Sequence, residues 1–294
     1  MMDVSFVFPY VNMDDPVWQS QWASTFPEKK INPVRARELG MLKYLFRGID
    51  ENLKWIDEVV MLVNTRTQVP DWVKDVRIVT VDEFIPRKFL PIFNSNAVEM
   101  FLAKVPGLGN GIIYSNDDFF PVKPLRYSDY FTEDGTPMIS FQEKEYPKSA
   151  YQRQCQRDWV TANGVLGKKI IGQAYRRPQH EPQAITRAQL KEASEALHDR
   201  RMGSITKVRD LSRNLSQYIY FDYVIASGRY VEREKYDLFS KITMSKLPDI
   251  EKCIMGNSYK WVILNDTSST DEMAVKEVIK MLDARFPRKS KFEK

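Results

Sequence analysis

The sequence feature that most constrains the fold is a helix-and-strand unit between Leu90 and Pro121. It predicts a buried strand, and two adjacent acids follow that strand directly. Apolar residues recur at helical spacing over residues 96–105, and Ser95 can cap this helix. Residues 111–114 form a short apolar run with a β-branched centre, which is typical of a strand buried on both faces. The run leads into Asn-Asp-Asp, so the sequence predicts two carboxylates at the C-terminal end of a buried strand.

Three predicted strands end in Asn and Asp residues. They cover residues 4–11, 111–114 and 260–264, and polar residues follow each of them. In open α/β sheets, ligands bind beyond the carboxyl ends of the strands, so we expect these side chains to line one crevice. Adjacent carboxylates repel each other unless a cation or a proton offsets their charge, which favours a metal-bound nucleotide phosphate. The residues at these strand ends are Asn12, Asp14, Asp15, Asn116, Asp117, Asp118, Asn265 and Asp266.

The order of the remaining elements indicates a mostly parallel sheet. Further strands are predicted over residues 58–63 and 76–81, and helices over residues 35–50 and 214–226. A last helix follows residues 270–271, either of which can cap it. Strands and helices that alternate at intervals of about 20–30 residues are typical of an α/β fold with a mostly parallel sheet.

Residues 127–203 lack long apolar faces, and we interpret them as loops and short helices that cover the crevice. The chain is therefore expected to form a single catalytic domain over residues 1–294. In this interpretation, residues 1–126 and 204–294 form the α/β core.

The same residues also have ordinary structural explanations. Asn-Asp-Asp after a strand can be a polar turn, and Asp14 and Asp15 before Pro16 can simply begin one. Glu99 lies in the helix before the second acidic strand, where it can point into the crevice or face water. An isolated histidine such as His180 is more often a structural hydrogen-bonding residue than a catalytic one.

The net charge of +5 is modest for 294 residues, but basic residues gather in one span. Such patches suit phosphate groups, anionic polymers or an acidic membrane surface, although a solvated face is an equally common explanation. The chain has no apolar run of about 18 residues and no signal-peptide features, so we expect a cytoplasmic protein, or one at the inner face of the plasma membrane. The basic span contains Arg176, Arg177, Arg187, Lys191, Arg200, Arg201, Lys207, Arg209 and Arg213.

Four blocks of the sequence resemble one known family. The first pairs YVNMDDPVW with WIDEVVMLVNTRTQVPDWV, and the second is FIPRKFLPIFNSNAVEMFLAKVPGLGNGIIYSNDDFF. The third is QHEPQAITR with KVRDLSRN, and the fourth is VILNDTSSTDEMAVKEVIKMLDARFPRKSKFE. In this order they resemble the Stealth proteins, sugar-phosphate transferases of bacterial capsule and cell-wall synthesis that include the lysosomal-enzyme N-acetylglucosamine-1-phosphotransferase. The chain departs from the family pattern at Met13, where the family usually has Gly, and at Phe46-Arg47-Gly48, where it has leucine-arginine-serine.

The resemblance implies a Rossmann-like core of the GT-A nucleotide-sugar transferase type. The implied reaction moves hexose 1-phosphate from a UDP-hexose donor to a hydroxyl of an acceptor glycan and releases UMP, with Mg²⁺ or Mn²⁺ as cofactor. Peripheral contact with a membrane through the basic surface is also expected, whereas nucleic acid is not an expected partner. Two rival hypotheses stay open: a metal-dependent glycosyltransferase that releases UDP, and a basic module that binds polyanions without chemistry.

The resemblance and the pattern of polar residues together predict roles for individual residues. The expected catalytic residues are Glu99, Asp118, His180 and Arg209. Arg213 is the alternative position for the family's arginine, and Asp118 is favoured as the base, because a buried acid beside other acids has a raised pKa. Asp117 and Asp266 are expected to bind the metal ion. The expected substrate-binding residues are Asn12, Asp15, Asn94, Ser95, Asn116 and Asn265.

Overall fold

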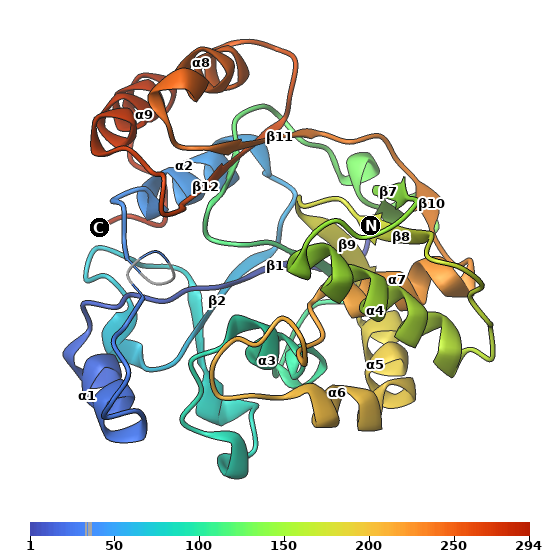
Figure 1. Ribbon diagram of the computed structural model, residues 1–294. Helices are drawn as coiled ribbons and strands as arrows, with labels where there is room; N and C mark the ends of the chain where they lie inside the picture. Colours follow the sequence, from blue (N-terminus) through green and yellow to red (C-terminus); the bar gives the residue numbers. More distant parts are fainter. Residues whose placement is uncertain (33, 35–36) are drawn as a thin grey trace.

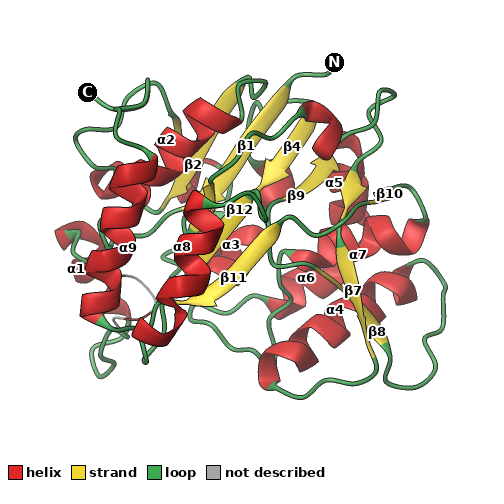
Figure 2. Ribbon diagram, turned by 90° about the horizontal axis from the view of Figure 1, so that it is seen from above, coloured by secondary structure: helices red, strands yellow, loops and turns green. Residues whose placement is uncertain are grey.

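A computed structural model describes residues 1–32, 34 and 37–294. Its centre is a five-stranded sheet with the order β3-β2-β1-β4-β9 (Figures 1 and 2). The first four strands run parallel, and β9 runs antiparallel to β4. The predicted α/β fold with a mostly parallel sheet is confirmed, and this arrangement is compatible with a Rossmann-like fold. The strands are β1 (Val4–Pro9), β2 (Glu58–Val63), β3 (Arg77–Thr80), β4 (Gly111–Tyr114) and β9 (Gln183–Thr186).

Helices cover both faces of this sheet, because its strands are apolar on both sides. In β1, Phe6 and Phe8 belong to one hydrophobic core and Val7 to the other, as expected for side chains that alternate along a strand. Figure 1 shows the two groups of helices on opposite sides. One side carries α2 (Leu42–Asn52), α8 (Leu247–Met255) and α9 (Glu272–Arg285). The other carries α3 (Ser95–Glu99), α4 (Ala150–Val165), α5 (Arg187–Ala196), α6 (His198–Ser204) and α7 (Tyr218–Ser227).

A second sheet of three strands contains β11 (Asp237–Lys241), β12 (Trp261–Asn265) and β5 (Phe119–Pro121). The strand predicted over residues 260–264 is therefore confirmed as β12, but it lies in this second sheet and not in the main one. The physical reason is β5, which follows β4 closely and pairs antiparallel with β12. The backbone N–H of Leu264 donates to the carbonyl oxygen of Asp118 at 3.1 Å, so the ends of β4 and β12 still meet.

Two helices are shorter than predicted. The predicted helix over residues 96–105 is the short α3, followed by a separate 3-10 turn at Leu102–Lys104. Its cap is Asn94 and not Ser95, because the Asn94 side chain accepts from the N–H of Asn96 at 3.2 Å. The helix predicted over residues 35–50 begins only at Leu42, and the predicted start at Arg35 lies outside the described residues.

The segment 127–203 is more regular than the predicted loops and short helices. It contains the sixteen-residue helix α4, then β9, which joins the main sheet, and it continues through α5 into α6. The hydrophobic pattern did not indicate α4, because several of the buried residues in this helix are polar, namely Gln154, Asp158 and Asn163. The remaining elements are α1 (Pro16–Thr25), β6 (Met138–Ile139), β7 (Phe141–Lys144), β8 (Tyr175–Pro178) and β10 (Val231–Glu232).

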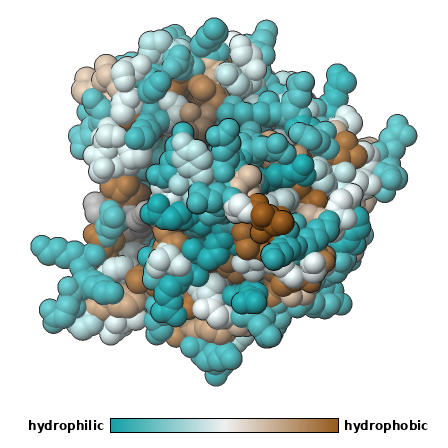
Figure 3. All heavy atoms as spheres, turned by 45° about the vertical axis from the view of Figure 1, so that its right-hand side comes forward, coloured by the Kyte–Doolittle hydropathy of each residue, from teal (hydrophilic) through white to brown (hydrophobic). Residues whose placement is uncertain are grey.

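Hydrophilic residues cover most of the face in Figure 3, and hydrophobic residues appear there in small groups. Throughout the described part of the chain, no helix is both long and apolar enough to cross a membrane.

Several of the basic residues in the span 175–213 form ion pairs or hydrogen bonds within the protein. Arg201 is buried and donates to backbone carbonyl groups, Arg176 pairs with Glu143, and Lys191 lies 4.0 Å from Glu195.

Candidate active site

A cavity of about 760 Å³ lies at the carboxyl ends of three strands. Tyr10 follows β1, Asn116 follows β4 and Asp266 follows β12, and all three side chains line the cavity. Strands β1 and β4 are neighbours in the main sheet, and the pairing of β12 with β5 brings the third strand end to the same place. The strand ends therefore form one crevice, in the position where open α/β sheets bind ligands.

Most of the expected site residues line this cavity although they come from separate parts of the chain. They are Asn94, Ser95, Glu99, Asn116, Asp117, Asp118, His180, Arg209, Asn265 and Asp266. The lining that the structure describes does not include Asn12, Asp15 or Arg213. Arg213 is exposed, which favours Arg209 as the arginine of the site.

Asn12 and Asp15 instead make the turn from β1 into α1. The Asp15 carboxylate caps α1 by accepting from the N–H of Trp18 at 3.0 Å. The side-chain oxygen of Asn12 accepts from the N–H of Asp14 at 2.9 Å. Strand β1 ends at Pro9, so these residues lie beyond the strand end that lines the cavity. Their expected contact with substrate stays a prediction.

Asp117 and Asp118 form the acidic part of the cavity. Burial raises the pKa of Asp118 to about 7, and the charge of Asp266 adds to the rise. Burial, followed by the charges of Asp118 and Glu38, raises the pKa of Asp117 well above its ordinary value. The Oδ1 atom of Asp118 is buried and has no hydrogen-bond partner among the described residues. Carboxylates in this situation bind a cation or share a proton.

Asp266 has a different environment, because Arg37 holds it. The guanidinium donates twice to the carboxylate, from Nε to Oδ2 at 2.6 Å and from Nη2 to Oδ1 at 2.5 Å. A bidentate pair of this kind fixes the orientation of both side chains. The pairing leaves Asp266 less available to a metal ion than the two acids after β4.

The acids of the cavity fit a magnesium ion with few protein ligands. In the residue ranges described above, no three Asp, Glu, His or Cys side chains are arranged to hold a metal ion. Mg²⁺ commonly binds to one or two carboxylates together with water and the phosphates of a substrate. Asp117 and Asp118, with the unpartnered Oδ1 of Asp118, meet that smaller requirement. The expectation of Mg²⁺ stays a prediction.

Glu99 lies in the wall of the cavity and is nearly inaccessible to solvent. Its carboxylate accepts from Asn96 Nδ2 at 3.0 Å, from the Tyr114 hydroxyl at 3.1 Å and from the N–H of Gln217 at 3.2 Å. Burial raises the pKa of Glu99, while the hydrogen bond from Asn96 and the charge of Arg209 oppose the rise. This carboxylate therefore joins α3, β4 and the start of α7 at the cavity wall.

Arg209 reaches the cavity from a loop that is tied to the segment before α3. The side-chain amide of Asn94 donates to the carbonyl oxygens of Thr206 and Val208 at 3.0 and 3.3 Å. Arg209 Nη2 donates to the Ser95 hydroxyl. Asn94 is 2% exposed, so its role in this structure is to fix the loop, whereas Ser95 and Arg209 face the cavity.

His180 lies in the loop between β8 and β9, within the segment that the sequence predicted to contain loops. Its Nδ1 shares a hydrogen bond of 2.5 Å with the Tyr218 hydroxyl. The imidazole packs edge-on against Phe119 and Phe239, with ring centroids at 5.0 and 5.3 Å. Burial, with the charges of Arg177 and then Arg209, lowers the pKa of His180 to about 4. The ring is therefore neutral at ordinary pH.

Comparison with known proteins identifies the family. Residues 35–139 match the family model described as Stealth protein CR2, conserved region 2. The chain belongs to the Stealth family. The matched region runs from before α2 to β6, and so contains Glu99, Asp117 and Asp118.

Relatives of this Stealth protein carry related names. It is 27% identical to the receptor polysaccharide phosphotransferase WefC of Streptococcus oralis and to the capsular polysaccharide phosphotransferase WcwK of Streptococcus pneumoniae, over all of each chain. The chain is also 31% identical to the exopolysaccharide phosphotransferase cps2G of Lactiplantibacillus plantarum, in a match that covers 60% of the present chain. That match spans about half of the cps2G chain.

Three cavity residues of this Stealth protein were not predicted from the sequence. Arg37 and Glu38 lie before α2 and line the cavity beside Asp266 and Asp117. Tyr218 lies at the start of α7 and holds the ring of His180. Nothing in the local sequence pattern marks these positions, because each acts on a partner far away along the chain.

Proposed function

We propose that this Stealth protein transfers hexose 1-phosphate from a UDP-hexose to a hydroxyl group of an acceptor glycan, and releases UMP, in the synthesis of a capsular or cell-surface polysaccharide. The observation that carries the proposal is the cavity, in which acids at strand ends face Arg209 and His180. The names of the relatives support phosphotransfer. A GT-A-type core is part of the same proposal, supported by the mostly parallel sheet with its ligand crevice at the strand ends.

In the proposed reaction, the acceptor oxygen attacks the β-phosphorus of the donor. A new P–O bond forms to the acceptor, and the P–O bond to the oxygen that bridges the two phosphates breaks, so UMP leaves. Phosphoryl transfer of this kind depends on positioning and on neutralising charge rather than on covalent chemistry by the protein. A cavity of about 760 Å³ is within the range usual for small-molecule sites.

The phosphate side of the site has one arginine and two acids in this proposal. Arg209, which lies beside the Ser95 hydroxyl, binds the diphosphate, because a guanidinium matches phosphate oxygens geometrically. Asp117 and Asp118 hold Mg²⁺ or Mn²⁺. The ion, when bound, neutralises charge on the phosphate oxygens. Asp266 is a weaker candidate than expected, because Arg37 occupies both of its oxygens.

His180 takes the proton of the acceptor hydroxyl in this proposal. Its pKa is low because of burial and because Arg177 and Arg209 add positive charge. A diphosphate bound by Arg209 offsets the charge of that arginine, so the pKa of His180 rises when the donor is present. Asp118, which the sequence analysis favoured as the base and whose pKa is about 7, becomes the alternative base, because this proposal assigns it to the metal ion.

The nucleotide product tests the reaction. The protein is incubated with UDP-hexoses, Mg²⁺ and a capsule-type oligosaccharide, and the nucleotides are separated by anion exchange. UMP together with a phosphodiester in the product is the expected result. UDP as the sole nucleotide product contradicts the proposal and favours the rival glycosyltransferase, which breaks the bond at the anomeric carbon.

The rival hypothesis of a basic binding module has weaker support. Of the Arg and Lys residues in the span 175–213, Arg209 is the only one among the described residues that line the cavity, and several others form ion pairs or backbone hydrogen bonds. Unpaired acids at the cavity repel a polyanion in the absence of a cation. The expected location in the cytoplasm or at the inner face of the plasma membrane, and peripheral membrane contact, stay predictions.

A further inference from the structure

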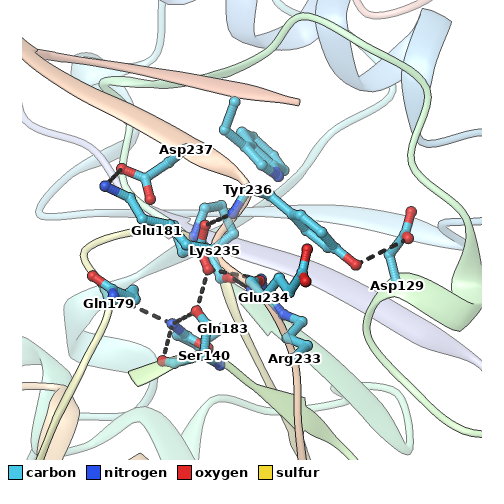
Figure 4. A network of polar contacts seen from close by, with 12 residues as sticks. Asp129, Ser140, Gln179, Glu181, Gln183, Arg233, Glu234, Lys235, Tyr236 and Asp237 are labelled. Atoms are coloured by element: carbon cyan, nitrogen blue, oxygen red, sulfur yellow. Dashed lines mark hydrogen bonds and ion pairs between the residues drawn. The ribbon is translucent and has the colours of Figure 1, made fainter. Parts of the chain in front are cut away.

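A buried ion pair holds the loop that carries His180. Glu181, the next residue, accepts from Arg233 Nη1 at 2.7 Å, and these side chains are 0% and 1% exposed (Figure 4). Removing two charges from water costs several kcal/mol per ion, so such a pair often contributes little net stability. Neither residue lines the cavity in the described structure. We therefore attribute the pair to the position in which it holds the loop that carries His180.

The hydrogen bonds around the pair fix the chain on both sides of His180. On the C-terminal side, Tyr236 N–H donates to Glu181 Oε2 at 2.9 Å, and Arg233 Nη2 donates to the carbonyl oxygen of Pro182 at 2.9 Å. The Ser140 hydroxyl also donates to Glu181. On the N-terminal side, Gln179 N–H donates to the carbonyl oxygen of Ser140 at 2.9 Å. Figure 4 shows these groups converging on the loop.

The same segment that supplies Arg233 also contacts the imidazole ring. Phe239, in β11, packs against His180 with ring centroids at 5.3 Å. Strand β11 pairs with β12, which ends beside Asp266 in the cavity. Residues 231–241 therefore connect the His180 loop to the acidic strand ends through backbone pairing and side-chain packing.

We propose that Glu181 and Arg233 are positioning residues of the active site, which act through His180 by holding its loop against β11 and do not contact the substrate. This inference rests on the role of His180 in the proposed function. Misplacement of a reacting group by about 1 Å can cost about 100-fold in rate. Loss of the ion pair should therefore affect turnover more than donor binding.

A double-mutant cycle tests whether the pair acts through His180. Arg233→Met should lower kcat by about 10- to 100-fold and change KM for the donor by less than about 3-fold. In a His180→Ala background, the same substitution should have no further effect on kcat, because the group that it positions is gone. If the two losses multiply, Arg233 acts independently of His180 and the proposal is wrong.

Two further variants separate positioning from stability. Glu181→Met combined with Arg233→Met removes both buried charges, so this variant should fold, yet it should keep the low kcat because the hydrogen bonds to the loop are lost. Arg47→Met is the matched control, since it breaks the ion pair of 2.9 Å with Glu293 away from the cavity. Arg47→Met should lower the melting temperature and leave kcat unchanged. A kcat loss for Arg47→Met equal to that of Arg233→Met overturns the proposal.

A titration of His180 measures the same effect without substrate. The chain has two histidines, so NMR resolves both rings, and a His198→Gln variant assigns them. In Arg233→Met, the pKa of His180 should rise from about 4 toward 6.5, because the released ring gains contact with water. An unchanged titration contradicts the positioning role. UDP as the product contradicts the proposed function instead, so the two failures are distinguishable.

Discussion

Replacing Asp118 by Asn should stabilise the protein and remove its activity. Asp118 lies beside Asp117 and near Asp266, and its buried Oδ1 has no hydrogen-bond partner in the described structure. The ionised carboxylate therefore destabilises the folded state, whereas a neutral amide of similar size avoids the repulsion. Activity should nevertheless be lost, because the same carboxylate is needed to hold the cation or to take a proton.

The pKa of Asp118 gives the magnitude. A rise from 3.8 to about 7 corresponds to at most about 4 kcal/mol of unfolding free energy, at about 1.4 kcal/mol per pKa unit. The side chain is only half-buried, and solvent screens its charge, so we expect about 1–3 kcal/mol. Between about pH 4 and about pH 7, the unfolded chain has lost the proton that the folded state retains. Stability therefore falls as the pH rises through this window, and the full cost is present above pH 7.

Thermal unfolding in EDTA measures the effect. At pH 8, Asp118→Asn should melt roughly 3–10 °C above the natural protein, and the difference should shrink at pH 5. Mg²⁺ should raise the melting temperature of the natural protein more than that of the variant, because binding to the folded state stabilises it. A variant that melts lower than the natural protein at pH 8, or a difference that does not depend on pH, refutes the reasoning.

Four other predictions concern the cavity. Arg209→Lys should lose most activity although the charge is kept, whereas Arg213→Lys should stay active; the opposite result moves the functional arginine to Arg213. His180→Ala should lower kcat by about 100-fold or more, with only a modest drop in melting temperature from the lost hydrogen bond to Tyr218 and the lost contacts with Phe119 and Phe239; an unchanged kcat rules out His180 as the base. Glu99→Ala should destabilise the protein by about 1–3 kcal/mol in denaturant unfolding, because three donors lose their acceptor, and unchanged stability contradicts that role. Excess EDTA should abolish turnover and Mg²⁺ should restore it; full activity in EDTA rules out an exchangeable ion.

Several features were predictable because neighbouring residues determine them. The strands over residues 58–63 and 111–114 have the predicted bounds, since short apolar runs with β-branched residues are buried on both faces of a parallel sheet. Asp271 caps the last helix by accepting from the N–H groups of Met273 and Ala274. The acids after β4 and β12 meet at one crevice as predicted, but Asp14 and Asp15 after β1 are not among the described residues that line it, and β12 reaches it through its pairing with β5 in the second sheet.

Other features depend on residues that only folding brings together. Asp266 and Arg37 are 229 positions apart, and Glu181 and Arg233 are 52 positions apart, yet each pair is in direct contact. Local periodicity and capping act within a few residues, so the sequence determined the strands, the last helix and the acids at the strand ends. The pairing of a charge with a distant partner depends on how the elements pack. The tertiary structure alone therefore decided that Asp266 is held by Arg37, that Asp15 caps a helix, and that a buried ion pair fixes the loop of His180.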